Sequence, residues 1–177
     1  MPGFIKISFC FFLASLLLSC GSSDDQKKTN VVDPKKYDTT LVKVNKTLVK
    51  NEDDQISNFI ERHQWKMQNS GTGLRYMIYS KGSGIKAEKG KHAVINFTVK
   101  LITGDVVYSS KQDGAKDILI GKSDEISGLE EGLLLLHVGD KARFIIPSHL
   151  AFGLLGDENK IPKRATLVYD VELTEIK

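Results

Sequence analysis

The chain has 177 residues and a formal net charge of +3, with 25 basic and 22 acidic side chains spread along it. Its length predicts one ordinary domain plus an additional segment, and its apolar content of 41% is typical of a globular protein. The mild, interspersed charge excludes the clustered basic face of a nucleic-acid-binding protein, so we expect no nucleic-acid partner.

The only segment suited to a membrane lies at the N-terminus and reads "MPGFIKISFCFFLASLLLSCGSS". Lys6 gives a short basic region, and the apolar run from Phe9 to Leu18 is well short of the roughly 20 residues that span a bilayer. This arrangement predicts a signal peptide over residues 1–19 rather than a transmembrane helix.

The end of that apolar run, "LLSCG", resembles a bacterial lipobox, which implies cleavage before Cys20 and a diacylglycerol group on its sulfur. The alternative is an ordinary signal peptide that contains a cysteine. Cys10 leaves with the signal, so Cys20 has no partner for a disulfide in the mature chain. Acylation would anchor the protein to the membrane, because each buried methylene contributes about 0.8 kcal/mol. Gly21 is not the aspartate of the enteric inner-membrane retention signal, so we expect a cell-envelope location at the outer membrane, on a face that the sequence leaves open.

Residues 20–36 are mostly polar and predict a flexible tether after the acylated cysteine. Residues 37–70 predict two short amphipathic helices, the second with Asn51 as its N-cap. Such helices are marginal alone, so they must pack on the following domain, on each other or on a second subunit, and the oligomeric state stays open. Their apolar stripes consist of Leu41, Val44 and Leu48, then Ile56, Phe59, Ile60, His63 and Met67.

From residue 73 to residue 177 the apolar residues alternate with polar ones, starting with a first strand in "LRYMIYS". This period predicts half-buried strands of an antiparallel sheet with one solvated face. A single helical stripe interrupts the strands, at Ile126, Leu129, Leu133 and Leu136. We therefore expect an α+β domain, a twisted antiparallel sheet closed over one short helix. The residues predicted to point inward are Ala93, Ile95, Phe97, Val99, Leu101, Ala142, Phe144, Ile146, Leu167, Tyr169, Val171 and Leu173.

The sequence contains no recognisable motif for nucleophilic, metal or nucleotide chemistry. "DILIGKS" lacks the earlier glycine of a phosphate loop, because that position is Lys116. The four histidines have no metal-ligand spacing, and we expect no metal, nucleotide or organic cofactor. What remains is a set of apolar residues that can converge between sheet and helix, and their spacing alone favours a core: Phe97, Ile126, Leu129, Phe152, Ile161 and Tyr169.

The ordered segments "VINFTVKLITGDVVYSS", "LIGKSDEISGLEEGL", "VGDKARFIIPSHLAFG" and "IPKRATLVYDVEL" resemble the FKBP-type peptidyl-prolyl isomerases. The resemblance covers residues 73–177 and implies a half-barrel of antiparallel strands wrapped on a short helix, with a shallow apolar pocket for a proline ring. Together with the lipobox, it is similar to FKBP-type lipoproteins that are linked to gliding motility in some bacteria.

The resemblance also implies roles for individual residues. Leu129 would form the pocket floor, the backbone N–H of Ile126 would bind the substrate carbonyl, and Ile161 would lie on a mobile flap. The residues that it places in catalysis are Phe97, Ile126, Leu129, Phe152 and Tyr169, and those that it places in substrate binding are Val107 and Ile161.

Five positions depart from the family pattern. Leu129 replaces a tryptophan, Phe97 and Phe152 replace tyrosines, Tyr108 replaces an acidic residue, and Lys116 replaces an aromatic one. Phe152 therefore lacks the hydroxyl that the family uses on bound ligand. We expect an envelope-anchored isomerase that acts on proline-containing polypeptides and assists the folding of exported proteins. The alternative is a non-catalytic chaperone or binding module of an envelope machine.

Overall fold

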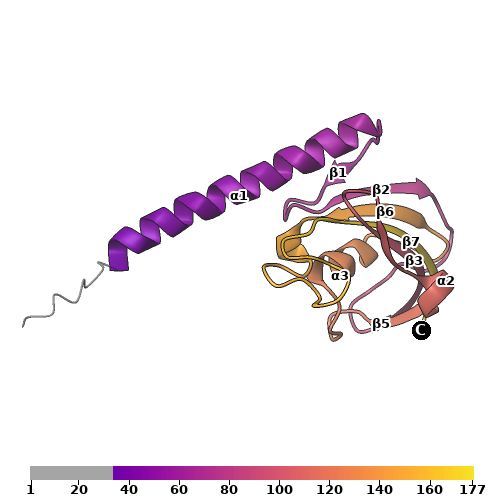
Figure 1. The fold of residues 1–177 in the computed structure, drawn as a ribbon. Helices are drawn as coiled ribbons and strands as arrows, with labels where there is room; N and C mark the ends of the chain where they lie inside the picture. Colours follow the sequence, from indigo (N-terminus) through magenta and orange to yellow (C-terminus); the bar gives the residue numbers. More distant parts are fainter. Residues whose placement is uncertain (1–33) are drawn as a thin grey trace, which may run out of the picture. The chain divides into compact units, whose positions relative to one another are not determined.

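The structure is a computed structural model that describes residues 34–177, so the predicted signal peptide, Cys20 and most of the predicted tether lie outside the described residues. Residues 39–177 form one compact unit. Figure 1 shows its curved sheet with one short helix, α3, on the inner side of the curve.

The N-terminal helical region is a single helix, α1 (Pro34–Arg62), and not the two helices that the sequence predicted. Asn51 lies inside this helix, so its predicted role as an N-cap is wrong. The reason is that Leu48, Glu52 and Ile56 follow one another at intervals of four, which keeps one face of the helix in phase across the acidic stretch. Because α1 begins at Pro34, the last residues of the predicted tether are helical.

The chain leaves the helix soon after Arg62, where Gln64 has a positive φ of 54°. Residues 63–70, predicted to be helical, form a turn and then the short strand β1 (Gln68–Asn69). The segment predicted as the first strand is therefore the second, β2 (Arg75–Ser80).

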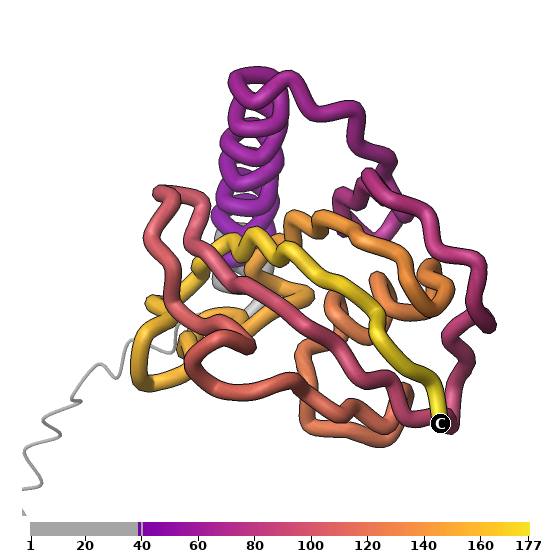
Figure 2. The backbone as a smooth tube through the Cα atoms, turned by 90° about the vertical axis from the view of Figure 1, so that its right-hand side faces the viewer, coloured from indigo at the N-terminus to yellow at the C-terminus, as the bar shows by residue number. Residues whose placement is uncertain are grey.

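The remaining elements follow in chain order as strands with short helices between them. In the described residues, seven strands form one sheet in the order β1-β2-β6-β7-β3-β4, with β5 also paired to β3. Every pairing is antiparallel, as predicted, and Figure 2 follows β3 and β7 along their length. The bounds are β3 (His92–Leu101), β4 (Val106–Ser109), α2 (Ser110–Asp113), β5 (Lys116–Leu119), α3 (Ser127–Leu133), β6 (Lys141–Ile146), a 3-10 helix η1 (Ser148–Leu150) and β7 (Leu167–Ile176).

The main core fills the space between the concave face of the sheet and α3. Two glycines let the helix approach the sheet: a Cβ on Gly128 would lie 2.4 Å from Ile146 Cγ2, and one on Gly132 would lie 2.7 Å from the ring of Phe144. The predicted alternation is confirmed, because the inward set is buried apart from Leu101, which is partly buried and packs against the core.

A second apolar cluster covers part of the opposite face of the sheet. Ile56 and Phe59 of α1 are buried against Ile145 of β6 and Val168 of β7. The expectation of one solvated sheet face is therefore only partly met, because the C-terminal half of α1 and the turn after it occupy some of that face. The half-buried side chains Trp65 and Met67 pack against the same cluster.

The described part of the N-terminal half of α1 presents its apolar side chains to solvent. Leu41 is 61% exposed and Val44 is 51% exposed. In the part of the chain that the structure describes, no helix is both long enough and apolar enough to span a membrane.

Candidate active site

A cavity of about 470 Å³ lies between β3, β4 and β7 of the sheet and the loop that connects η1 to β7. The two long strands position its base, since Val99 of β3 is paired with Tyr169 of β7. The cavity lining combines apolar and polar side chains: Phe97, Val99, Tyr108, Asp113, Lys116, Phe152, Asp157, Asn159, Ile161 and Tyr169.

The apolar part of the lining comes from residues far apart in the sequence. Phe97, Ile161 and Tyr169 are all buried, and Phe152 is half-buried in the loop wall. Each of these four residues was predicted for the site, and the structure brings them together. Such a surface can hold a small apolar group and exclude water from it.

The hydroxyl of Tyr169 is the polar group of this apolar wall. It has no hydrogen-bond partner among the side chains and backbone groups that the structure describes, and no fully buried side-chain oxygen or nitrogen among them lacks a partner. The hydroxyl is therefore reached from the cavity. Burial raises the pKa of Tyr169 far above its ordinary value, and the Glu125 carboxylate adds to this shift, so the group stays protonated as a donor.

A polar rim closes one side of the cavity by linking β4 to the loop. The Tyr108 hydroxyl donates to Asp157 Oδ2 at 2.5 Å, and Asp157 Oδ1 accepts the backbone N–H groups of Asn159 and Ile161 at 2.9 and 2.7 Å. Asp157 thus fixes the loop backbone at Ile161, and Tyr108 fixes Asp157.

The rim pair is held as a neutral phenol and an ionised carboxylate. The hydrogen bond to Asp157 raises the pKa of Tyr108, with a smaller contribution from burial. Burial alone would raise the pKa of Asp157, but the hydrogen bonds from Tyr108, Ile161 and Asn159 outweigh it and the pKa is lowered.

Two lysines add cationic groups to the cavity edge. Lys116 Nζ is paired with Glu125 and lies 5.6 Å from the centroid of the Phe97 ring. Lys160 Nζ lies 4.8 Å from the centroid of the Tyr108 ring. Lys116, at the position for which the sequence resemblance implies an aromatic residue, is thus a cation that contacts an aromatic neighbour.

The other three predicted site residues do not line the cavity. Val107, Ile126 and Leu129 are buried in the main core, and Leu129 is completely inaccessible. The predicted roles of Val107 and Leu129 in substrate contact remain predictions. Ile126 precedes α3, and its backbone N–H has no acceptor among the described residues, so its predicted contact with the substrate carbonyl remains a prediction.

Sequence reasoning missed the role of Asp157. The replacement of an acidic residue by Tyr108 is visible in the sequence, but the compensating carboxylate comes from a loop 49 residues later. The remaining signal is an aspartate in the polar stretch between Phe152 and Ile161. In the described residues, no group of three or more His, Cys, Asp or Glu side chains is arranged to hold a metal ion.

The half-barrel fold thus carries an apolar cavity with a hydrogen-bonded polar rim, which can hold a small apolar group. The family model of the FKBP-type peptidyl-prolyl cis-trans isomerases matches residues 83–174. The chain belongs to this family.

Curated relatives agree with this assignment. The chain is 37% identical over 110 residues to a probable FKBP-type isomerase, FkpA, of Neisseria meningitidis, which covers 62% of this chain and 40% of that protein. It is 30% identical over 154 residues to FkpA of Aeromonas hydrophila, covering 86% and 56%, and 37% identical to FK506-binding protein 2 of Dictyostelium discoideum, covering 52% and 70%. The chain thus spans about half the length of the FkpA relatives.

Solved structures have the same fold. The crystal structure of FkpA from Escherichia coli superimposes with a TM-score of 0.64 and 27% identity, covering 83% of this chain and 74% of that one. The crystal structure of AtFKBP13 superimposes with a TM-score of 0.60 and 27% identity, covering 64% and 100%. The FKBP-like fold expected from the sequence is therefore confirmed.

Proposed function

We propose that the protein is a peptidyl-prolyl cis-trans isomerase that acts on proline-containing polypeptides. The single observation that carries this proposal is the apolar cavity formed by Phe97, Phe152, Ile161 and Tyr169 on the FKBP-type frame. Rotation about an Xaa-Pro bond makes and breaks no covalent bond, so catalysis does not require an activated nucleophile in the cavity.

The cavity can lower the rotational barrier by holding the proline ring in a dry site. The barrier of about 18–20 kcal/mol comes from amide resonance. The twisted amide has lost that resonance and has a less polar carbonyl, so an apolar, water-poor wall favours it over the planar ground state. The Tyr169 hydroxyl is a cavity-lining donor that can orient the substrate backbone. The Ile126 N–H lies outside the lining and has no acceptor among the described residues, so it is a second donor only if the substrate reaches it.

The cellular setting is a further part of the proposal. The lipobox-like "LLSCG" supports acylation of Cys20, which would hold the domain at the cell envelope, at the outer membrane, where it would assist the folding of exported proteins. The similarity to FKBP-type lipoproteins of gliding bacteria makes a motility machine one such setting. Mass spectrometry of the protein from membranes tests the anchor, and an unmodified thiol at Cys20 would rule it out.

Proline exchange tests the activity directly. The mature chain with Cys20→Ser is added to an Xaa-Pro peptide, and the cis-trans exchange rate is measured by NMR. We expect clear acceleration, because uncatalysed exchange takes tens to hundreds of seconds, and we expect Phe97→Asp to abolish it. No acceleration at micromolar enzyme would refute the activity.

A second candidate is a polypeptide-binding module without catalysis. The observation that favours it is the apolar stripe at the N-terminal half of α1, whose members are at least 37% exposed: Leu41, Val42, Val44, Leu48 and Val49. Suppression of client aggregation by a variant with an inactivated cavity would support this candidate over the isomerase.

A further inference from the structure

Glu52 of α1 is unusual for a helix carboxylate, because it is only 9% exposed and accepts three hydrogen bonds. The donors belong to two residues that lie 96 and 114 positions later in the sequence. Its Oε1 accepts the backbone N–H of Ser148 at 2.7 Å and the hydroxyl of Thr166 at 2.8 Å. Its Oε2 accepts the hydroxyl of Ser148 at 2.9 Å. Both oxygens are therefore committed to these two partners.

The two partners of Glu52 mark the ends of one loop. Ser148 begins η1, and Thr166 immediately precedes β7. Between them run residues 149–165, which include Phe152, Asp157 and Ile161 of the cavity lining. One carboxylate outside the cavity thus holds both ends of the segment that forms one cavity wall.

Backbone hydrogen bonds extend this hold to the lining residues. The carbonyl of Ser148 accepts the N–H groups of Ala151 at 3.1 Å and of Gly153 at 2.8 Å, the two neighbours of Phe152. The carbonyl of Gly153 in turn accepts the N–H of Arg164 at 2.8 Å, close to the far end of the loop. A shift of Ser148 would therefore move the residues on both sides of Phe152.

We infer that Glu52 is a positioning residue of the isomerase site, which couples α1 to the loop wall of the cavity. This inference rests on the proposed function for its effect on catalysis, and on the contacts above for its effect on the loop. A carboxylate suits the task because it accepts several bonds at once and forms stronger hydrogen bonds than a neutral acceptor.

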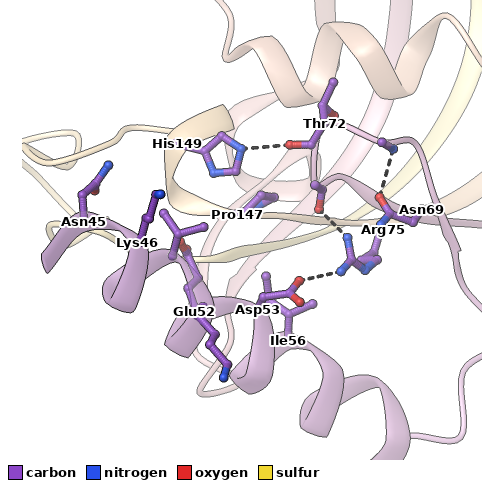
Figure 3. A pocket seen from close by; sticks show the side chains of 14 residues that line it. Asn45, Lys46, Glu52, Asp53, Ile56, Asn69, Thr72, Arg75, Pro147 and His149 are labelled. Carbon is purple, nitrogen blue, oxygen red and sulfur yellow. Dashed lines mark hydrogen bonds and ion pairs between the residues drawn. The ribbon is translucent and has the colours of Figure 1, made fainter. Parts of the chain in front are cut away.

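The neighbouring residue provides a matched control on the same helix. Asp53 accepts no hydrogen bond from the loop: its Oδ1 instead accepts one from Arg75 Nη2 of β2 at 2.5 Å (Figure 3). Asp53 is 55% exposed, so its pair is a surface contact between α1 and the domain. If Glu52 acts only by docking α1, loss of Asp53 should have a similar kind of effect. If Glu52 positions the loop, only its own loss should reach the cavity.

Two substitutions of Glu52 differ in the hydrogen bonds that they can keep. Glu52→Leu keeps the bulk of the side chain and a strong helix former, but it leaves Ser148 and Thr166 without an acceptor. Glu52→Gln keeps one oxygen for the Ser148 N–H and the Thr166 hydroxyl, and its amide nitrogen can donate to the Ser148 hydroxyl, so it should rescue the arrangement. Asp53→Asn removes the charge of the control pair.

The experiment measures kcat/KM for an Xaa-Pro peptide and amide hydrogen exchange at Gly153 and Arg164, using the mature chain with Cys20→Ser. For Glu52→Leu we expect kcat/KM to fall roughly ten- to hundredfold and both amides to exchange faster, with strand β3 unchanged. Glu52→Gln should stay within about threefold of the wild type and Asp53→Asn within about twofold. Wild-type kinetics and exchange in Glu52→Leu would overturn the inference, as would equal losses in Asp53→Asn.

A second variant and a readout independent of activity keep the test decisive. If Glu52→Leu does not fold, Thr166→Val removes a single donor at similar shape, and it should speed exchange at Arg164 more than in strand β3; unchanged Arg164 exchange would overturn the inference. If the wild type shows no isomerase activity, the proposed function is wrong, and hydrogen exchange alone decides the positioning role. Faster exchange at Gly153 in Glu52→Leu but not in Glu52→Gln then supports it, and identical exchange in the two variants overturns it.

Discussion

Removal of the Tyr169 hydroxyl tests how the cavity orients its substrate. This hydroxyl faces the cavity, has no partner among the described residues and stays protonated because burial raises its pKa. Phe152 has lost the hydroxyl that the family pattern places in the loop wall. We therefore expect Tyr169, which lines the same cavity, to supply the donor that Phe152 cannot.

The magnitude follows from one neutral hydrogen bond. A bond of this type contributes about 0.5–1.5 kcal/mol, so Tyr169→Phe should lower kcat/KM for an Xaa-Pro peptide by about two- to twelvefold. The free energy of unfolding should stay the same or rise, because the folded protein loses no internal hydrogen bond and sheds a polar group from an apolar wall.

The assay combines NMR exchange kinetics with denaturant unfolding of the same two proteins. A lower kcat/KM together with an unchanged or higher free energy of unfolding distinguishes the loss of a substrate contact from general damage to the fold. A Tyr169→Phe protein with unchanged kcat/KM would show that the hydroxyl does not touch the reacting peptide. A protein that loses both activity and stability would show that the hydroxyl has a structural partner, which contradicts the geometry.

The remaining predictions concern the rim and the core. Tyr108→Phe should loosen the loop, seen as faster hydrogen exchange at Ile161. The difference in the Ile161 exchange rate between Tyr108→Phe and the wild type should be largest at neutral pH. It should fade as the pH falls through the pKa of Asp157, which is lowered below its ordinary 3.8, because the carboxylate then protonates. A difference in exchange rate that grows on acidification would contradict this prediction. Leu129→Ala should lower the free energy of unfolding by about 2–5 kcal/mol, because the side chain is fully buried. A loss of kcat/KM without a loss of unfolding free energy would instead place Leu129 in the cavity. Gly128→Ala should cost about 1–3 kcal/mol in thermal unfolding, because its Cβ would clash with Ile146, and wild-type stability would show that α3 can move away.

The sheet could be predicted well because its pattern is local. Alternation in "KHAVINFTVKL" follows the period of the strand itself, and the structure buries Ile95 and Phe97 on one face as expected. Helix α1 was harder, because the acidic residues after Asn51 resemble a helix start. Glu52 is instead buried by hydrogen bonds to partners 96 and 114 residues away, which no local pattern reveals.

In the candidate site, too, local patterns could be predicted and long-range contacts could not. Phe97 and Tyr169 could be placed from strand period and family resemblance together, since both lie on regular strands. The contact between Tyr108 and Asp157 could not, because it depends on how a long loop folds back over β4. The complete burial of Leu129 in the main core depends on how α3 packs against the sheet, which no local pattern reveals.

The most direct test of the central claim locates the proline ring and measures its rotation in the same sample. Nuclear Overhauser contacts between an Xaa-Pro peptide and the mature chain are recorded together with the cis-trans exchange rate. We predict contacts from the proline ring to Phe97, Ile161 and Tyr169, with exchange accelerated above the uncatalysed rate. Acceleration without these contacts, or these contacts without acceleration, would contradict the assignment of isomerisation to this cavity.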